Sequence, residues 1–464
     1  MSMADGLFDG GNSDIPGGIV SPVERVVIIG AGMAGLTVAN ALRQASVDCV
    51  VLEARDRIGG RLHTVDLDGW PVDLGGSWIH TPIGNPLRRL ADQAGVACHG
   101  ADPLPEAVAY DCGEGRRLTP DELAACLDLQ FEAFPAAQAS LLSELGPDAS
   151  MAEAIDSFVG ALGLQAAADR RARQALQTDI EGESAGGAED QSLRWMWHEL
   201  EYGGDFFGDV PAGGYATLIG AIAANADNAV LHLGAEVTEV QYSADGVAVR
   251  DTTGRTEEGT HAVVTVPLGV LKKGSPAFLP SLPGDRTAAI DRLGFGHLEK
   301  VAMRFERPFW REAGAPHLFI FPRQAGEPMM WVLGNDAFGG GPVLMAEIFH
   351  SATHHIRGKS PAESASYVLR AVSEALGSSC PVPISVAVSS WADDPYSAGA
   401  YSHIPPGATP ADADLLGEPV GGRVLFAGEH TQSSRLVYAD GAMASGIREA
   451  KRLLGKASIQ LGMP

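Results

Sequence analysis

Residues 25–61 read RVVIIGAGMAGLTVANALRQASVDCVVLEARDRIGGR, and this stretch decides the fold. A β-branched run is followed by a glycine turn, a helical pattern and a second apolar run that ends at Glu53. Gly30 permits the tight turn, Gly32 lets the backbone approach a pyrophosphate, and Gly35 permits close contact between helix and strand. This order predicts a βαβ unit that binds a dinucleotide, with the pyrophosphate at the positive end of the helix.

The residues from Glu53 onward indicate which dinucleotide is bound. Glu53 ends the second strand, where an acid can hold the ribose hydroxyls. The run from Glu53 to Arg61 resembles the signature of FAD-binding oxidases, an acid followed by GGR, in which Gly59 and Gly60 let backbone amides face the phosphates. The segment Asp73–His80, DLGGSWIH, is similar to the loop over the flavin ring in amine oxidases. The absence of a second glycine fingerprint argues against a disulfide-reductase layout with its own NADPH domain.

Further motifs extend the resemblance from about residue 24 to 455. They are VTVPLGVL at 264–271, GFGHLEK at 294–300, FAGEHT at 426–431, Trp391 and Tyr401. With them the chain resembles the flavin monoamine oxidase superfamily, and polyamine oxidases and the histone lysine demethylase are its nearest apparent relatives there. The resemblance implies an α/β fold, with a Rossmann-like FAD-binding domain of the GR2 type and an interleaved α+β substrate-binding domain of the amine oxidase fold.

The resemblance also implies that both domains are discontinuous in sequence. The FAD-binding domain is expected to comprise residues 23–100, 210–275 and 415–464. The substrate-binding domain would comprise residues 101–209 and 276–414, with a sheet over the flavin and helices behind it. Residues 1–22 are rich in Gly and Asp, and they predict a flexible N-terminal tail.

The family pattern assigns residues to a bound FAD. Val237 would lie beside the adenine, Glu429 near the pyrophosphate and ribityl chain, and Ala439 would present its amide to the pyrimidine edge of the flavin. Monoamine oxidases attach FAD through a cysteine at the position of Ala400, so non-covalent FAD is expected here. The candidate cofactor-binding residues are Gly30, Ala31, Gly32, Met33, Ala34, Gly35, Glu53, Ala54, Arg55, Gly59, Gly60, Arg61, Gly75, Gly76, Ser77, Trp78, Val237, Pro267, Trp391, Gly428, Glu429 and Ala439.

The same resemblance yields five candidate catalytic residues: Lys300, Tyr401, Tyr438, Trp391 and His80. The lysine would reach flavin N5 through a water and assist the reaction with oxygen. The two tyrosines would flank the substrate amine with electron-rich faces, and the tryptophan would stack near the flavin ring. The histidine matches one at the tunnel wall of several animal polyamine oxidases. From the residues alone, a solvent-exposed edge-strand lysine, packing aromatics and a structural histidine are the alternatives.

Two polar stretches precede the segment at 210–275. Glu199, Glu201 and Asp205 could receive a distal ammonium of the substrate, although an exposed acidic loop explains them equally well. The stretch from Glu181 to Asp190 has low hydrophobicity and predicts a loop.

Between the motifs the sequence predicts helices and short strands. Ser150 and Glu153 form a capping box, and Ser360 opens a helix that ends at Gly377. Residues 230–266 contain short alternating runs broken by Asp-Gly and Thr-Gly turns, which predicts a meander. Further strands are expected at 300–306, 317–321, 328–333, 343–349 and 384–391.

These parts predict an FAD-dependent oxidase of a small primary or secondary amine. Hydride would pass from the carbon next to nitrogen to flavin N5, and the imine would hydrolyse to an aldehyde. Reduced flavin would then react with O2 to give H2O2. Diamines, polyamines, N-methylated amines and aromatic monoamines are all open as substrates.

Three other functions compete with this prediction. An L-amino-acid oxidase on the same fold needs a cation for the substrate carboxylate, and Arg435 is the candidate. A desaturase acting on carbon without nitrogen would give the paired tyrosines no nitrogen to hold. A non-enzymatic binding or scaffold protein is disfavoured because the sequence shows no basic tail, coiled-coil insertion or chromatin module.

The overall composition limits the partners. A formal net charge of −25 argues against nucleic acid and is compatible with a cationic substrate. Runs of about 18 or more apolar residues are absent, so no membrane span is expected. The five cysteines lack metal-ligand spacing, which predicts no metal site and reduced thiols. We therefore expect a cytoplasmic monomer or homodimer whose partners are a small-molecule amine and O2.

Overall fold

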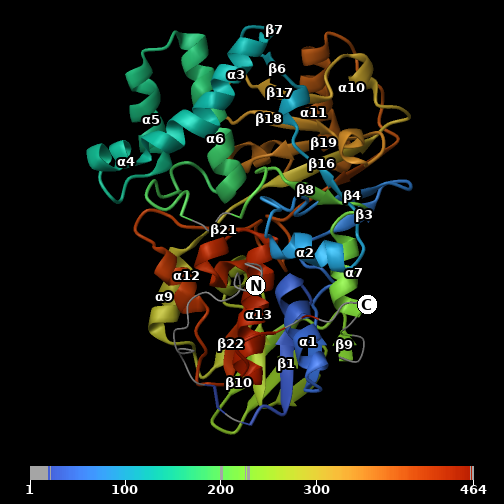
Figure 1. Cartoon of the computed structure of the whole chain (residues 1–464), viewed down its shortest axis with the longest axis vertical. Helices are drawn as coiled ribbons and strands as arrows, with labels where there is room; N and C mark the ends of the chain where they lie inside the picture. Colours follow the sequence, from blue (N-terminus) through green and yellow to red (C-terminus); the bar gives the residue numbers. More distant parts are fainter. Residues whose placement is uncertain are drawn as a thin grey trace, which may run out of the picture.

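The computed structural model describes residues 19–20, 22–198, 202–224, 226, 230–459 and 461. These residues form two lobes stacked along the long axis of the molecule, called the lower and upper lobes after their places in Figure 1. The lower lobe contains the fingerprint helix and the C-terminal helix. The upper lobe contains a large sheet with helices beside it.

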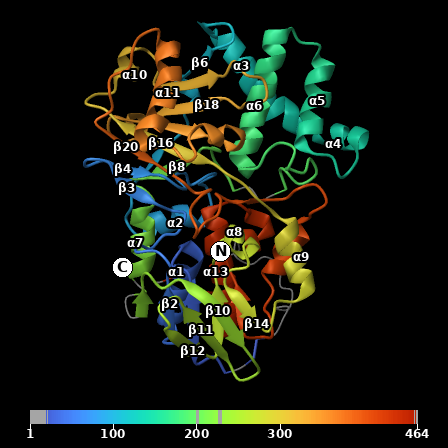
Figure 2. The ribbon, with the colours of Figure 1, turned by 180° about the vertical axis from the view of Figure 1, so that it is seen from behind.

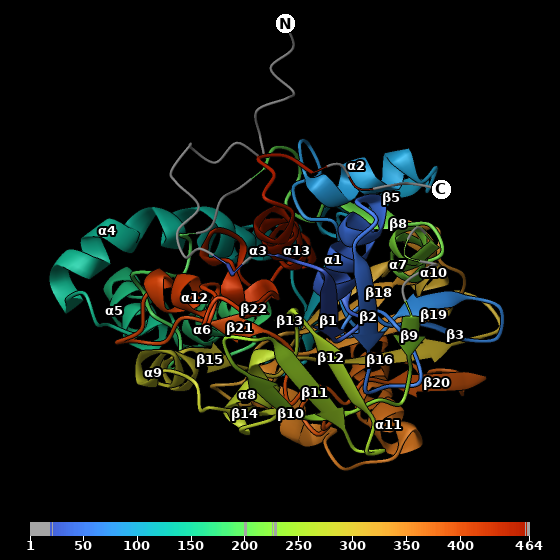
Figure 3. The ribbon, with the colours of Figure 1, turned by 90° about the horizontal axis from the view of Figure 1, so that it is seen from below.

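A five-stranded parallel sheet lies at the centre of the lower lobe. Its strands, in spatial order, are β22 (Val424–Phe426), β13 (His261–Val264), β1 (Arg25–Ile29), β2 (Asp48–Leu52) and β9 (Val230–His232). One face is covered by α1 (Met33–Gln44), α7 (Ala216–Ala224) and α13 (Ala439–Leu454), as seen in Figure 3. The predicted unit β1–α1–β2 is confirmed, and the apolar residues of β1 are buried on both faces because both faces are covered.

The other face of this sheet packs on a second, four-stranded sheet, which Figure 2 shows from behind. Its order is β12 (Thr256–Gly259), β11 (Val247–Asp251), β10 (Val237–Tyr242) and β14 (Ala277–Leu279). The predicted meander is therefore right for β10 to β12 and wrong for its two ends. Strands β9 and β13 join the parallel sheet instead, since β13 is buried at every position and fits a strand covered on both faces.

The lower lobe also includes chain that the sequence assigned to the substrate-binding domain. β14 pairs with β10, and the lobe is completed by α8 (Leu268–Lys272), α9 (Gly284–Arg292) and α12 (Pro410–Leu416). Ala289 and Ile290 of α9 and Ala413 of α12 belong to the same buried cluster as the parallel sheet. The apolar faces of these segments are buried in the lower lobe, so the predicted boundaries near 275 and 415 lie inside that lobe.

The upper lobe is built on a seven-stranded mixed sheet. Its order is β20 (Ser385–Val388), β16 (Glu299–Arg304), β19 (Val343–Ile348), β18 (Met330–Gly334), β17 (His317–Phe321), β6 (Ala107–Asp111) and β7 (Arg116–Arg117). The five strands predicted between 300 and 391 are confirmed as β16 to β20. One face packs on α11 (Pro361–Leu376), whose predicted start at Ser360 is confirmed by a capping box with Glu363.

Four helices stand beside this sheet in Figure 1: α3 (Pro120–Asp128), α4 (Phe134–Leu145), α5 (Met151–Leu162) and α6 (Ala166–Ser184). The capping box of Ser150 and Glu153 at the start of α5 is confirmed. The loop predicted from Glu181 is wrong for its first four residues, because α6 continues to Ser184. Glu181 is buried, and its carboxylate accepts hydrogen bonds from Gln177 and from the backbone of Ser351, so tertiary contacts extend the helix.

The described chain also contains three short pairs of strands and two further α-helices. Three two-stranded pairs are β3 (Thr64–Asp66) with β4 (Pro71–Asp73), β5 (Cys98–Gly100) with β8 (Asp209–Pro211), and β15 (Gly294–Phe295) with β21 (Ser402–His403). The two further α-helices are α2 (Pro86–Gln93) and α10 (Phe309–Glu312). Among the described residues, no helix combines the length and apolar character that a bilayer crossing requires.

Candidate active site

A cavity of about 430 Å³ lies between the lobes, lined by residues from both. It gathers the predicted site residues from segments hundreds of residues apart. Of the candidate cofactor-binding and catalytic residues named from the sequence, all line this cavity except Ala31 and Gly35. Those two lie directly behind the wall, where Ala31 contacts Glu53 and Gly35 packs on Gly30.

The glycine fingerprint forms one end of the cavity. Gly30 has a φ of +104°, a backbone conformation that would be strained in a residue with a side chain. A Cβ atom at Gly35 would lie 2.0 Å from the Gly30 carbonyl oxygen, so this position has no room for a side chain. Glu53 is buried at the end of β2, where its carboxylate accepts hydrogen bonds from the backbone amides of Ala31 at 2.7 Å and Arg55 at 2.9 Å. The acid is thus fixed beside the N-terminus of α1, as a dinucleotide site requires.

An ion pair between a half-buried arginine and a buried glutamate lies further along the same cavity. Arg61 Nη1 is 2.9 Å from Glu429 Oε1 and 2.8 Å from the Ala400 carbonyl oxygen. Burial alone would raise the pKa of Glu429, but the Arg61 guanidinium and hydrogen bonds from neighbours such as Ser402 hold it below its usual value. Arg55, also predicted to bind the cofactor, directs its guanidinium to both carboxylate oxygens of Asp394.

Lys300 lies on β16, between β20 and β19, and its side chain is only 4% exposed. The exposed edge-strand alternative is therefore wrong. Its Nζ donates to Ser77 Oγ at 2.7 Å and to the Gly75 carbonyl at 2.9 Å, and it lies 3.5 Å from Glu347 Oε1. Burial raises the pKa of Glu347, and the Lys300 ammonium opposes that rise. The lysine is thus held against the loop predicted to cover the flavin.

The two tyrosines are anchored on neighbouring residues of α6. The Tyr401 hydroxyl donates to the Gly182 carbonyl, and the Tyr438 hydroxyl donates to Glu183 Oε2 at 3.0 Å. Burial raises the pKa of Tyr401 well above its usual value, so this phenol stays neutral. The last turn of α6 therefore fixes both hydroxyls on one side of the cavity.

Arg435 packs against the Tyr438 ring, with its guanidinium carbon 3.9 Å from the ring centroid. The guanidinium also binds both carboxylate oxygens of Asp440, at 3.0 and 2.7 Å. Arg435 is not among the residues that line the cavity in the described chain. Its charge is therefore committed to Asp440, and it supports the ring from outside the cavity.

Trp391 and His80 complete the predicted set. The Trp391 indole donates to the Leu74 carbonyl at 3.0 Å, which fixes a buried ring on the cavity wall. The His80 ring lies 5.5 Å from the Tyr438 ring, and its Nδ1 is 2.8 Å from the Phe206 carbonyl oxygen. Burial lowers the pKa of His80 to about 4, so the imidazole is neutral at physiological pH.

Sequence reasoning missed the acidic wall of the cavity. Asp179 and Glu183 line it from α6, and Glu347 lines it from β19. The signal was present, since two acids four residues apart share one face of a helix, but the predicted loop concealed it. Asp205 is exposed and does not line the cavity, while Glu199 and Glu201 lie outside the described residues.

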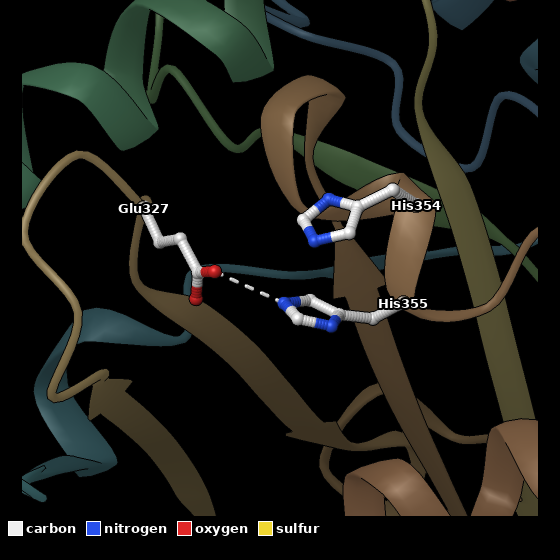
Figure 4. A group of neighbouring side chains, drawn as sticks. All are labelled: Glu327, His354 and His355. Carbon is white, nitrogen blue, oxygen red and sulfur yellow. Dashed lines mark hydrogen bonds and ion pairs between the residues drawn. The ribbon is translucent and has the colours of Figure 1, made fainter.

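One group in the described chain has metal-ligand atoms close together, and Figure 4 shows it. The ligand atoms of Glu327, His354 and His355 lie within 4.8 Å of one another. His355 Nε2 is 3.0 Å from Glu327 Oε1, and none of the three residues lines the cavity. This group therefore lies outside the cavity between the lobes.

Comparison with known proteins gives the family. Residues 33–454 match the family described as flavin containing amine oxidoreductase. The chain belongs to this family. Its cofactor is FAD, and the fixed acid beside α1, the glycine turn and the cavity between the lobes fit such a group. Glu53 and the fingerprint backbone would hold the adenosine end, and the residues around Lys300, Tyr401 and Tyr438 would surround the flavin ring.

Similar proteins include several described as plant histone demethylases. Lysine-specific histone demethylase 1 homolog 3 of Oryza sativa subsp. japonica is 32% identical over 92% of this chain and 54% of its own length. Lysine-specific histone demethylase 1 homolog 1 of Arabidopsis thaliana is 34% identical over 93% of this chain and 52% of its own length. The chain thus spans about half the length of these relatives.

A solved structure of a putrescine oxidase double mutant, redesigned in cofactor binding, has the same fold. It superposes with a TM-score of 0.74 and covers 94% of this chain and 100% of its own, at 21% sequence identity. The predicted amine oxidase fold is therefore confirmed.

Proposed function

We propose that this chain oxidises a small primary or secondary amine and passes the electrons to O2. The observation that supports this most is that Tyr401, Tyr438 and Lys300 line one cavity together with the dinucleotide fingerprint. Bound FAD supplies the acceptor for a hydride from the carbon next to the amine nitrogen. The imine that leaves hydrolyses in water to an aldehyde.

The tyrosines orient the substrate nitrogen in this proposal. Tyr401 is a neutral phenol anchored to the Gly182 carbonyl, and Tyr438 is anchored to Glu183. Their ring faces are electron-rich and attract a positively polarised nitrogen. Arg435 packs on the Tyr438 ring and is fixed by Asp440, so this tyrosine cannot rotate freely. Such fixed rings hold the reacting carbon in one orientation.

Lys300 acts on the oxygen side of the reaction in this proposal. Its ammonium is enclosed and held by Ser77 and Gly75, beside the Glu347 carboxylate. A fixed positive charge in a cavity stabilises negative charge that develops as oxygen is reduced. The three contacts keep that charge in place without a large rearrangement.

The amino-acid oxidase alternative loses its candidate cation. Arg435 binds Asp440 with two hydrogen bonds and is not among the cavity-lining residues. Recruiting it to a substrate carboxylate would leave Asp440, which is 2% exposed, without that partner. The histone demethylases are similar over only half of their length, so a methylated lysine is one substrate to be tested rather than an assignment.

The test is peroxide release by the purified protein across a panel of amines. The panel holds alkyl monoamines, alkyl diamines, polyamines, aromatic monoamines, an N-methylated lysine peptide and L-amino acids. We expect oxidation of amines, with an aldehyde as the identified product, and none of L-amino acids. Oxidation of an L-amino acid to its 2-oxo acid, with no amine oxidised, would overturn the proposal.

A further inference from the structure

The inference concerns the acidic wall of the cavity and rests on the function proposed above. Asp179 and Glu183 lie one turn apart on α6, and both line the cavity. Residues four apart on a helix are neighbours on one face, about 5–6 Å apart at their Cβ atoms. Glu183 also accepts the hydrogen bond of the Tyr438 hydroxyl, so the pair begins beside one tyrosine and extends away from it along the helix.

Asp179 is the member of the pair with the fewest compensating contacts. Its carboxylate accepts one long hydrogen bond, 3.4 Å from Gln130 Nε2, and no positively charged side chain of the described chain is among the groups that act on it. Burial, and then the negative charge of Glu183, raises the pKa of Asp179 to about 8. An enclosed carboxylate beside a second one is unfavourable unless a proton or another cation compensates the charge.

The surrounding wall suits an alkyl chain with a cationic end. Phe131, Phe207, Trp331 and Phe349 line the same cavity, and their rings form a continuous series. Ring centroids are 6.3 Å apart between Phe131 and Phe207, 5.8 Å between Phe207 and Trp331, and 6.0 Å between Trp331 and Phe349. Aromatic faces accept methylene groups and attract ammonium groups, and the neutral His80 imidazole adds no positive charge.

We propose that Asp179 and Glu183 bind a second, protonated nitrogen of the substrate while the first nitrogen lies between Tyr401 and Tyr438. The substrate class is then an alkyl diamine or a polyamine. A monoamine would bring no second cation to Asp179. Asp205, one of the acids that the sequence suggested for this role, is exposed and does not line the cavity.

The experiment compares 1,4-diaminobutane with n-pentylamine, which has similar length and a methyl group in place of the distal ammonium. Peroxide release gives kcat/KM for each, and their ratio measures the contribution of the second nitrogen. We expect the parent protein to favour the diamine by about 100-fold or more, and Asp179→Asn and Glu183→Gln each to lower the ratio by about tenfold or more. Asp205→Asn is the matched control and should leave the ratio unchanged. Glu183→Gln retains an oxygen acceptor for Tyr438.

Three other outcomes would contradict the subsite, its location or the proposed function. Equal oxidation of both amines by the parent protein would refute the second-nitrogen subsite and leave the amine oxidase proposal intact, and this result needs no variant to fold. A ratio that falls in Asp205→Asn but not in Asp179→Asn would place the subsite on the exposed loop and refute our assignment. Failure to oxidise any amine would overturn the proposed function and the subsite together.

Discussion

The hydroxyl of Tyr438 lies 3.0 Å from a carboxylate oxygen of Glu183, so the residue that precedes α13 is fixed by the last turn of α6. These two residues belong to different lobes and are separated by more than 250 positions. The contact therefore joins the two lobes and fixes the orientation of a ring on the cavity wall. The neighbouring residue, Gly182, does the same for Tyr401.

The tyrosine pair can be tested by removing first the hydroxyls and then the rings. Tyr401→Phe and Tyr438→Phe should retain most of the rate of flavin reduction, because each ring face survives. Tyr401→Ala and Tyr438→Ala should each lose about 1 kcal/mol or more of transition-state stabilisation, at least about fivefold in rate. Anaerobic stopped-flow with saturating amine measures this, with Tyr242→Phe and Tyr242→Ala as controls outside the cavity. Alanine variants that reduce their flavin at the parental rate would refute the role of the pair.

Lys300→Met should slow the reaction of reduced enzyme with oxygen more than it slows flavin reduction. The substitution keeps an unbranched side chain of similar length and removes the charge held by Ser77 and Gly75. Stopped-flow measurement of both half-reactions separates the two effects, and exposed Lys359→Met is the control. Reoxidation of the variant at the parental rate would exclude the oxygen-side role.

Glu53→Ala should weaken FAD binding by about 1.5–3 kcal/mol for each charge-assisted hydrogen bond lost to the ribose. The carboxylate also holds the backbone amides of Ala31 and Arg55, so Glu53→Gln should be less damaging than Glu53→Ala. Titration of apoprotein with FAD gives the dissociation constants. Unchanged affinity in Glu53→Ala would show that this acid does not contact the cofactor.

FAD should leave the polypeptide on acid precipitation, because Ala400 occupies the position at which monoamine oxidases carry the linking cysteine. Ala400 is 7% exposed and its carbonyl accepts a hydrogen bond from Arg61, so the backbone there is fixed next to the cavity. The measurement is flavin absorbance in the supernatant and in the pellet. Yellow colour retained by the washed pellet would contradict non-covalent binding.

The sequence predicted the parts of this protein whose signals are local. The glycine fingerprint, the capping boxes at Ser150 and Ser360, and the five predicted strands of the upper sheet, β16 to β20, depend on short patterns, and all are present in the structure. The end of α6 depends instead on Ser351, 170 residues away, which binds the Glu181 carboxylate. A prediction from the sequence around residues 181–184 alone cannot include a contact with a residue so far along the chain.

The acidic wall of the cavity was missed for the same reason. Asp179 and Glu183 have the i, i+4 spacing of a helix face, but that spacing carries meaning only once residues 181–184 are known to be helical. The meander ends were misplaced because strand alternation does not say which sheet a strand joins. The buried run of β13 fits a parallel sheet, whose other members come from distant segments.

The most direct test of the central claim is anaerobic mixing of the purified, FAD-loaded protein with 1,4-diaminobutane while the visible absorption of the oxidised flavin is recorded. We predict complete loss of that absorption, its return when O2 is admitted, and formation of one aldehyde and one H2O2 per flavin reduced. The panel of amines used above serves as the second set of reductants. Flavin that stays oxidised with every amine in the panel would contradict the account.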